Sequence, residues 1–223
     1  MTPDVAGRTG PHQGQPVETA GVPLENARAA MVMVHGRGAT AESILSLATA
    51  LDIEGFAFLA PQAYGYTWYP NSFMSPIPSN EPGITSGLAA IGDIMALIHA
   101  AGVPSERTML LGFSQGACLS LEFAARNAHR YGGIATLSGG LIGPDGTPRD
   151  YHGDFDGTPA FLGCSDVDGH IPARRVIESA QVLERMGASV TTRLYPGMGH
   201  LVNEDEIEHV RAMMTEVADS ASA

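Results

Sequence analysis

A serine stands between two glycines near the middle of the chain, in the pattern Gly-x-Ser-x-Gly. The five residues are Gly112-Phe113-Ser114-Gln115-Gly116, with an apolar run before them and a helical pattern after them. At a sharp turn from strand to helix, a serine hydroxyl points out of the sheet, and a side chain at either glycine would clash with nearby backbone. With these flanks, the pattern predicts that Ser114 is a nucleophile that attacks a carboxylic ester or thioester.

A serine hydroxyl needs a neighbouring base to become a nucleophile near neutral pH. His200 follows the last apolar run in a short glycine-rich loop, Pro196-Gly197-Met198-Gly199-His200, which can place an imidazole over the serine. We therefore predict that His200 is the base. Three other histidines are less suited, because two fall at helical positions and one in a polar loop. They are His129, His209 and His152.

The base needs a carboxylate that orients the imidazole and stabilises its protonated form. Asp166 and Asp168 both follow the apolar run Ala160–Gly163, and position alone does not separate them. The spacing Asp-x-Asp-x-His, which ends at His170, is also compatible with a metal site. Oxygen-rich metal sites usually need more ligands than this segment offers, so we predict no metal ion.

Six short apolar runs alternate with five helical patterns along the chain. Most of the runs are apolar throughout, which is typical of strands buried on both faces of a parallel sheet. The last run is more mixed, which indicates a strand near an edge. The runs are Ala30–Val34, Phe56–Ala60, Thr108–Leu111, Gly133–Leu137, Ala160–Gly163 and Val190–Tyr195. The helical patterns cover about 42–51, about 86–100, the segment after Ser114, about 173–186 and about 204–217.

This alternation predicts an α/β fold with a mostly parallel central sheet and helices on both faces. Sites in such sheets form beyond the carboxyl ends of the strands. Pro172 is placed to open the fourth helix, and Asn203 with Glu206 to cap the last one. Residues 1–26, rich in glycine, proline and polar groups, are predicted to be a loosely structured arm before a single domain, 27–223, without a separate lid domain.

The composition excludes several classes of function. The 223 residues include 24 acidic and 12 basic side chains, a formal net charge of −12, which disfavours binding to nucleic acids and to anionic membranes. No apolar run reaches about 18 residues, so we expect no stable membrane insertion. The two cysteines are expected to be reduced thiols in a cytoplasmic protein.

Four motifs, in order and at specific spacing, carry a resemblance to a known family. They are His35-Gly36-Arg37-Gly38 after the first predicted strand, the Ser114 pentapeptide, Asp168 four residues before Pro172, and Gly199-His200. From about Ala29 to the last helix, the chain resembles the carboxylesterase/phospholipase family of α/β-hydrolases. That family includes the acyl-protein thioesterases and small bacterial carboxylesterases.

The resemblance implies the α/β-hydrolase fold, no cofactor, possible homodimerisation, and Asp168 rather than Asp166 as the acid. It also implies an oxyanion hole made by the backbone amides of Arg37 and Gln115. The chain departs from the family pattern at three positions. Gly169 and His170 stand where proline and an aliphatic residue are common, and this keeps Asp166 open as the acid. Arg37 replaces a residue that is usually hydrophobic, and its guanidinium either meets an acidic substrate group or is a solvated surface group.

A long loop after Pro61 holds the only tryptophan and half of the six tyrosines. Long ordered loops in compact domains are usually functional. We predict that Trp68, Tyr69 and Phe73 wall the substrate pocket, the alternative being that these aromatic rings only cover the edge of the sheet.

The predicted function is a serine hydrolase with a Ser-Asp-His triad and an open site. Its substrate would be a small ester, or an acyl group on a larger carrier. The alternatives are a non-catalytic ligand-binding protein on the same fold and, among enzymes, a lysophospholipase or a lactonase, because the same triad serves all of these reactions.

Overall fold

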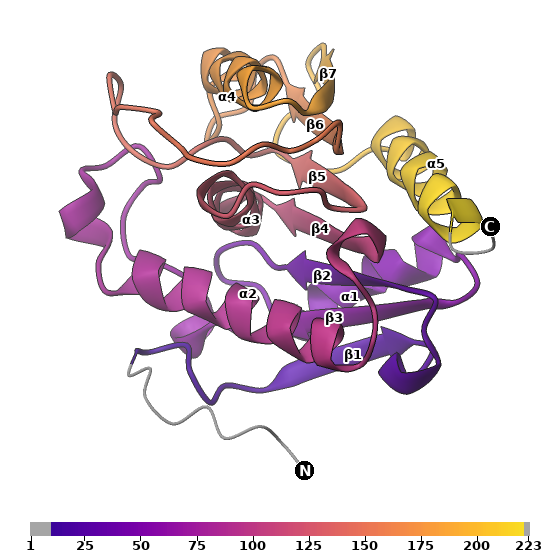
Figure 1. The fold of residues 1–223 in the computed structure, drawn as a ribbon. Coiled ribbons are helices and arrows are strands. Elements are labelled where there is room, and N and C mark those ends of the chain that lie inside the picture. Colours follow the sequence, from indigo (N-terminus) through magenta and orange to yellow (C-terminus); the bar gives the residue numbers. More distant parts are fainter. Residues whose placement is uncertain (1–9, 221–223) are drawn as a thin grey trace.

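A seven-stranded sheet forms the centre of the computed structural model, which describes residues 10–220 (Figure 1). The strand order is β1-β3-β2-β4-β5-β6-β7. Neighbouring strands run parallel throughout, except that β1 pairs antiparallel with β3. The strands are β1 (Val17–Gly21), β2 (Ala29–Val34), β3 (Phe56–Pro61), β4 (Thr108–Phe113), β5 (Gly133–Leu137), β6 (Pro159–Ser165) and β7 (Ser189–Tyr195).

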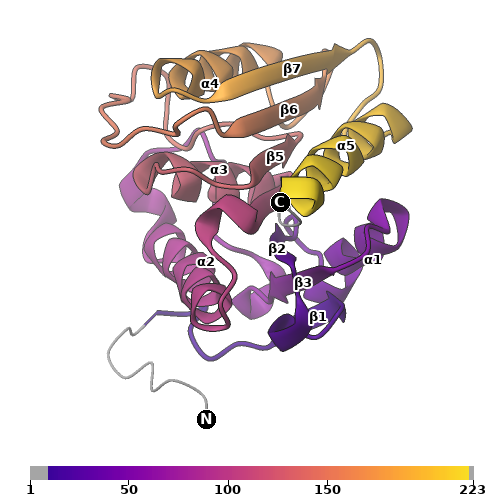
Figure 2. The ribbon, with the colours of Figure 1, turned by 45° about the vertical axis from the view of Figure 1, so that its right-hand side comes forward.

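Helices cover both faces of this sheet (Figures 1 and 2). α2, α3 and α4 pack on one face, and α1 and α5 on the other. Strand β2 serves both cores, because alternate side chains point to opposite faces: Ala30, Val32 and Val34 face the first group of helices, whereas Ala29, Met31 and Met33 face the second. The helices are α1 (Ala41–Leu51), α2 (Gly83–Ala100), α3 (Gln115–Arg126), α4 (Ala173–Arg185) and α5 (Glu204–Ser220).

The mostly parallel sheet with helices on both faces is thus confirmed, and the described chain shows no separate lid domain. β7 lies at the sheet edge, as its mixed sequence indicated. The capping of α5 is also confirmed, since the amide of Glu206 donates to Asn203 Oδ1 and the amide of Asn203 donates to Glu206 Oε2, both at 2.9 Å. Pro172 differs slightly from its predicted place, because it precedes α4 as the N-cap residue.

The prediction of a loosely structured arm over residues 1–26 is wrong for residues 10–26, and residues 1–9 lie outside the described part of the chain. Val17–Gly21 forms β1, and a short 3-10 turn follows at Leu24–Asn26. β1 alternates between exposed and half-buried residues and is held through its backbone pairing with β3. An edge strand of this kind has no buried apolar run, so the pattern used to find strands does not detect it.

One helix among the described residues, α2, is long and apolar enough to cross a membrane, with a mean hydropathy of 1.4 over 18 residues. Its apolar side chains are used inside the fold: Ile84, Ile91, Ile94 and Ile98 are buried against the sheet. The apolarity of α2 is therefore that of a core helix.

Candidate active site

The serine turn joins β4 to α3 at the carboxyl edge of the sheet. Ser114 has φ 55° and ψ −119°, in a region that residues other than glycine rarely adopt. A Cβ atom on Gly116 would clash with the carbonyl of Val34, and one on Gly112 would lie 2.5 Å from the backbone of Gly116. Both glycines are thus required by close backbone contacts, and the turn holds the Ser114 hydroxyl beyond the end of β4.

Three side chains far apart in sequence form a hydrogen-bonded chain at this edge. Ser114 Oγ lies 2.8 Å from His200 Nε2, and His200 Nδ1 lies 2.7 Å from Asp168 Oδ2. The Asp168 side chain is fully buried, and that of His200 is 22% exposed. A hydroxyl, an imidazole and a carboxylate in this order can transfer a proton from the serine as it attacks a carbonyl group.

Asp168 also accepts hydrogen bonds from two backbone amides of its own loop. The amides of His170 and Ile171 donate to its other oxygen, Oδ1, at 2.8 Å and 3.0 Å. Burial by itself raises the pKa of Asp168, but the hydrogen bonds from His200 and from these amides outweigh it and lower the pKa below its usual value. The ionised carboxylate accepts only, which favours the tautomer with a proton on His200 Nδ1.

Asp166, the other candidate acid, lies elsewhere in the loop. Its Oδ1 atom accepts from the amide of Gly197 at 2.8 Å, and Ser165 Oγ accepts from the amide of Gly199 at 3.0 Å. Both bonds hold the loop that carries His200. Among the described residues, no three His, Cys, Asp or Glu side chains are grouped so that they could hold a metal ion.

The backbone amides predicted to form the oxyanion hole, those of Gln115 and Arg37, belong to segments next to the serine turn. Gln115 opens α3, so its N–H is one of those that a helix leaves without an intrahelical acceptor. Gly36 packs against the turn, where an added Cβ atom would lie 3.4 Å from the Ser114 Cβ atom. This contact brings the backbone next to Arg37 close to the serine.

The Gln115 side chain has a function that the sequence did not reveal. Its Oε1 atom accepts from the amide of Trp68 at 2.9 Å, and its Nε2 atom donates to the carbonyl of Tyr69 at 2.8 Å. Gln115 thus connects the aromatic loop to the serine turn.

A pocket of about 390 Å³ opens beside the Ser114 hydroxyl. Two of the three residues predicted to wall the substrate pocket, Tyr69 and Phe73, line it. Trp68 does not, and its predicted place in the pocket wall is wrong. The indole is fully buried and packs against the rings of His12 and His35, at centroid distances of 5.1 Å and 5.0 Å. The lining residues are Arg37, Tyr69, Pro70, Asn71, Ser72, Phe73, Ser114, Gln115, Cys118, His170, Ile171 and His200.

Two buried histidines form hydrogen bonds with the backbone of the aromatic loop. His12 bonds the Trp68 carbonyl through Nε2 at 2.8 Å and accepts from the amide of Tyr64 at Nδ1. His35 accepts from the amide of Ala63 at Nε2 and donates to the Gly36 carbonyl from Nδ1. Burial lowers the pKa of both imidazoles, more than their backbone hydrogen bonds raise it, which favours their neutral forms.

Arg175 is a second buried group that the sequence did not reveal. Its side chain is fully buried, and its Nη1 atom donates to the carbonyls of Leu141 and Gly143 at 2.9 Å and 2.6 Å. The guanidinium carbon lies 5.8 Å from the centre of the Phe73 ring, and the Gly143 amide donates to the Phe73 carbonyl. Arg175 therefore supports one wall of the pocket from behind.

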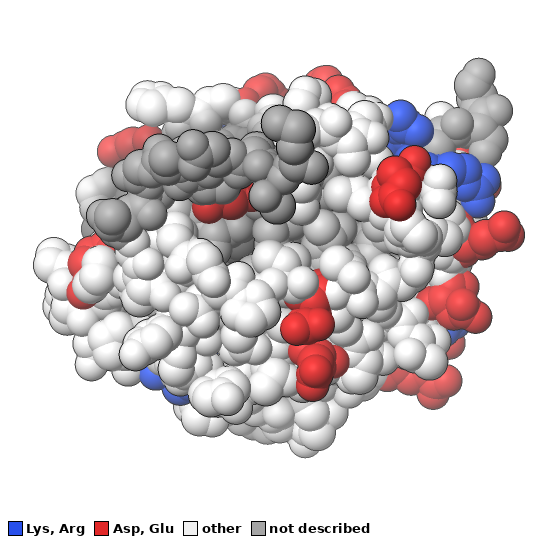
Figure 3. All heavy atoms as spheres, turned by 90° about the horizontal axis from the view of Figure 1, so that it is seen from below, with Lys and Arg blue, Asp and Glu red and all other residues white. Residues whose placement is uncertain are grey.

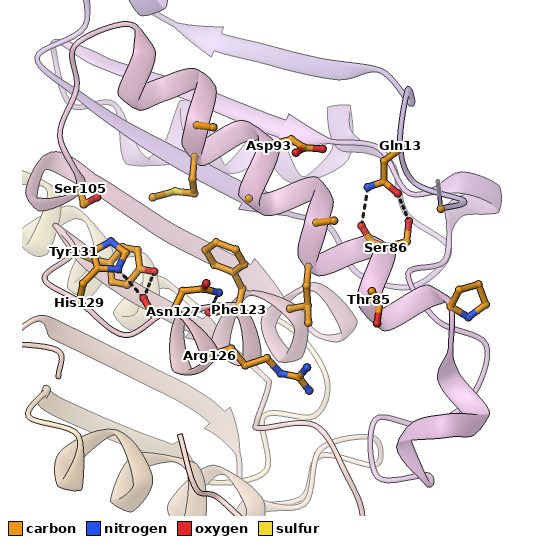
Figure 4. A pocket seen from close by; sticks show the side chains of 17 residues that line it. Gln13, Thr85, Ser86, Asp93, Ser105, Phe123, Arg126, Asn127, His129 and Tyr131 are labelled. Carbon is orange, nitrogen blue, oxygen red and sulfur yellow. Dashed lines mark hydrogen bonds between the residues drawn. The ribbon is translucent and has the colours of Figure 1, made fainter. Parts of the chain in front are cut away.

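A larger hollow of about 790 Å³ lies between α2 and the end of α3 and shares no residue with the Ser114 pocket (Figure 4). Its polar groups largely bond one another: Ser86 donates to Gln13 at 2.7 Å, and Tyr131 donates to the Asn127 carbonyl at 2.8 Å. None of the serines that line it is hydrogen-bonded to an imidazole in the described structure. The hydrogen-bonded Ser114 and His200 side chains line the smaller pocket.

Comparison with protein families gives a match over most of the chain. The profile of the Phospholipase/Carboxylesterase family matches residues 18–217. A solved structure described as a phospholipase/carboxylesterase from Dyadobacter fermentans is 45% identical and superposes with a TM-score of 0.88, covering 93% of this chain and 99% of that one.

Curated relatives are more distant. An acyl-protein thioesterase 1 from Gibberella zeae is 34% identical over 116 residues, 51% of this chain and 49% of the relative. A probable carboxylesterase SOBER1-like from Arabidopsis thaliana is 23% identical over 215 residues, 88% of this chain and 82% of the relative. The chain spans about half the length of the first curated relatives that it matches, at 49% and 57%.

Proposed function

Because the chain belongs to the phospholipase/carboxylesterase family of α/β-hydrolases, we propose that it is a serine hydrolase that cleaves carboxylic esters or thioesters. The observation that carries the proposal is the continuous hydrogen-bonded chain from Ser114 through His200 to the buried Asp168. In the proposed mechanism these residues are the nucleophile, the base and the acid of a catalytic triad.

The first half of the reaction forms an acyl-enzyme. His200 Nε2 takes the proton of Ser114 as Oγ attacks the carbonyl carbon, and Asp168 stabilises the imidazolium that results. The negative charge on the carbonyl oxygen is bound by the amides of Arg37 and Gln115, which act as the oxyanion hole. His200 then gives its proton to the leaving alcohol or thiol, and the ester or thioester bond breaks.

The second half returns the enzyme to its starting state. Water takes the place of the leaving group, His200 removes its proton, and the hydroxide attacks the acyl-enzyme carbonyl. The acid product leaves when Ser114 Oγ recovers the proton from His200. Every proton transfer in this cycle goes to or from His200, so the proposal requires neither a metal ion nor an organic cofactor.

The pocket supports a substrate class of modest size. Its volume of about 390 Å³ is at the small end for ligand pockets, and Tyr69 and Phe73 supply an apolar wall. A small ester fits this description, and so does a short acyl group on a larger carrier that stays outside. The proposal includes a cytoplasmic location, supported by the buried and unpaired Cys118 and Cys164, and a possible homodimer, which rests on family resemblance alone.

Replacement of the nucleophile tests the proposal. Ser114→Ala is expected to fold normally and to lose roughly a thousandfold or more in turnover of ester substrates, because the attacking oxygen is removed while the turn is unchanged. Circular dichroism provides the folding control. Retention of wild-type turnover in this variant would refute the assignment.

Covalent labelling separates the enzyme from a non-catalytic binding protein on the same fold. A fluorophosphonate probe reacts with an activated serine, so mass spectrometry of the labelled chain is expected to find the adduct on Ser114 in the wild type. The Ser114→Ala variant should remain unlabelled. A wild-type chain that is folded and yet unreactive would favour the binding protein.

A further inference from the structure

The pocket beside Ser114 differs in charge from the chain as a whole. The chain has 24 acidic and 12 basic residues, and acidic side chains are spread over the face shown in Figure 3. None of the twelve described residues that line the pocket is acidic, whereas Arg37, His170 and His200 are all basic. A pocket that excludes carboxylates on so acidic a protein is suited to a ligand that is itself an anion.

Two ionisable side chains that line the pocket with Arg37, Tyr69 and Cys118, add no negative charge to it. Burial is the main cause that raises the pKa of Tyr69 well above its usual value, and burial raises the pKa of the Cys118 thiol to about 12. Both groups are therefore neutral near pH 7. The Arg37 guanidinium is thus the one fixed charge among the described residues that line this pocket.

The guanidinium is also held in place before any ligand binds. Arg37 Nη1 donates to the Pro70 carbonyl at 2.9 Å, Nη2 donates to the Asn71 carbonyl at 2.6 Å, and Cζ lies 6.0 Å from the centre of the Tyr69 ring. Neutral carbonyls take up only some of its five N–H donors. In an exposed ion pair, much of the favourable Coulomb energy is offset by the conformational entropy lost when a long side chain is ordered. The Arg37 side chain is already ordered by these contacts, so an anion that binds to it does not have to order it.

We propose that the substrate of this hydrolase carries an anionic group, a carboxylate or a phosphate, which binds to the Arg37 guanidinium while the reacting carbonyl lies at Ser114. The inference rests on the proposed function, because it names the substrate class of the same site. The planar guanidinium offers paired N–H donors that match two oxygens of either anion. The His170 imidazole, whose ring centre lies 4.8 Å from that of His200, adds a further hydrogen-bonding group at the pocket.

The experiment compares esters that differ in charge at one position. One pair places the charge on the acyl side: the mono-4-nitrophenyl ester of succinic acid and 4-nitrophenyl butyrate. A second set places it on the leaving group: phenyl butyrates with a para carboxylate, phosphate or methyl group. The measured quantity is the ratio of kcat/KM for the anionic ester to that for its neutral partner, which is compared between variants so that intrinsic reactivity cancels.

In Arg37→Gln, this ratio is expected to fall about tenfold or more in at least one set, mainly through a higher KM for the anionic ester. The set in which it falls tells which side of the ester faces Arg37, and the para substituents distinguish carboxylate from phosphate. Arg37→Lys should recover part of the ratio, because it keeps the charge and loses the planar fork.

Arg185→Gln is the matched control. It removes one exposed positive charge in the last turn of α4, away from the carboxyl ends of the strands, and is expected to leave the ratio unchanged. An unchanged ratio in Arg37→Gln, or an equal loss for neutral and anionic esters, would overturn the proposal and leave Arg37 as a group that positions the loop.

Failure of this inference and failure of the proposed function give different results. If the proposed function is wrong, Ser114→Ala retains whatever ester cleavage the wild type shows. If only the anion site is wrong, cleavage disappears with Ser114 and the charge ratio does not depend on Arg37.

Discussion

Ser114 is enclosed by buried backbone from β2, β4 and α3, whereas His200 stands on a glycine-rich loop after the exposed edge strand β7. On the serine side, Gly112 and Gly116 leave no room for even one more carbon atom. On the base side, Gly197 and Gly199 have φ values of 66° and 79° and no backbone near them that a Cβ would meet. Packing fixes Ser114, the proposed nucleophile, and a small number of hydrogen bonds fixes His200, the proposed base.

This difference indicates which measurement responds to a substitution on each side. A substitution at the serine side forces closely packed backbone segments apart, so we expect the free energy of unfolding to decrease. A change at the base side breaks one bond in a solvent-exposed loop, so turnover falls while the fold persists. Four substitutions test this difference, and they are given in order of decreasing expected effect.

Gly116→Ala tests the packed side. The added methyl group would overlap the Val34 carbonyl, so strand and helix must separate, and we expect destabilisation by more than about 4 kcal/mol or a loss of soluble protein. Denaturant unfolding provides the measurement. Gly169→Ala is the matched control on the base side, because its new Cβ atom would meet nothing within 4 Å. Equal stability of the two variants would contradict the comparison.

Asp168→Asn tests the proposed acid, which is hydrogen-bonded to His200. An amide keeps the shape of the carboxylate and can still accept from the amides of His170 and Ile171, so the fold is expected to remain stable. The negative charge that stabilises the imidazolium is lost, and turnover of an ester should fall roughly a thousandfold. Steady-state kinetics together with thermal unfolding measure both effects. A variant with near-normal turnover would remove Asp168 from the mechanism.

The same division explains what the sequence could predict. Buried parallel strands and the serine turn have local signals, namely short apolar runs and two glycines at fixed spacing, and both were found with bounds close to those observed. The choice between Asp166 and Asp168 had no local signal, because it depends on how one loop folds back onto another. Family resemblance favoured Asp168, and the geometry places that carboxylate at His200.

The missed features depend on partners distant in sequence. His12 bonds residues 52 and 56 positions away, so nothing near it in the chain indicates a buried support for the pocket loop. The sequence predicts Trp68 in the pocket because aromatic loops often line sites. Its packing against two histidine rings shows instead that the indole is buried and does not line the pocket. Arg175 has the appearance of a surface residue on an amphipathic helix, and its burial follows from carbonyls supplied by a different loop.

Glu206→Gln tests a buried carboxylate on the base side. Burial raises the pKa of Glu206 from 4.5 to about 7, more than its bond to the Asn203 amide lowers it, and its Oε1 atom has no hydrogen-bond partner in the described structure. Because the pKa of Glu206 is higher in the folded chain than in the unfolded chain, its neutral form stabilises the fold relative to its ionised form. This contribution to the free energy of unfolding is fully present below about pH 4.5 and is lost as the pH rises through about 7.

Glutamine resembles the neutral acid, so the variant is expected to be more stable than the wild type by about 2 kcal/mol at pH 8 and nearly equal to it at pH 4.5. Free energies of unfolding in denaturant at the two pH values measure this difference. Glu208→Gln, on the exposed side of α5, is the control and should show no such pH-dependent gain. A gain of the same size at both pH values would show that charge on Glu206 is not the cause.

Asp166→Ala tests the weakest support of the base side. The substitution removes the acceptor for the Gly197 amide, and the loop that presents His200 becomes less well ordered. We expect a loss of about tenfold in kcat with little change in KM, and a decrease in stability of about 1 kcal/mol or less, because a single exposed hydrogen bond is removed. Asp166→Asn should restore most of the turnover, since its amide oxygen can still accept from Gly197. If Asp166→Ala instead lost as much turnover as Asp168→Asn, Asp166 would be more than a support for the loop, and hydrogen bonds alone would not explain how the base is held.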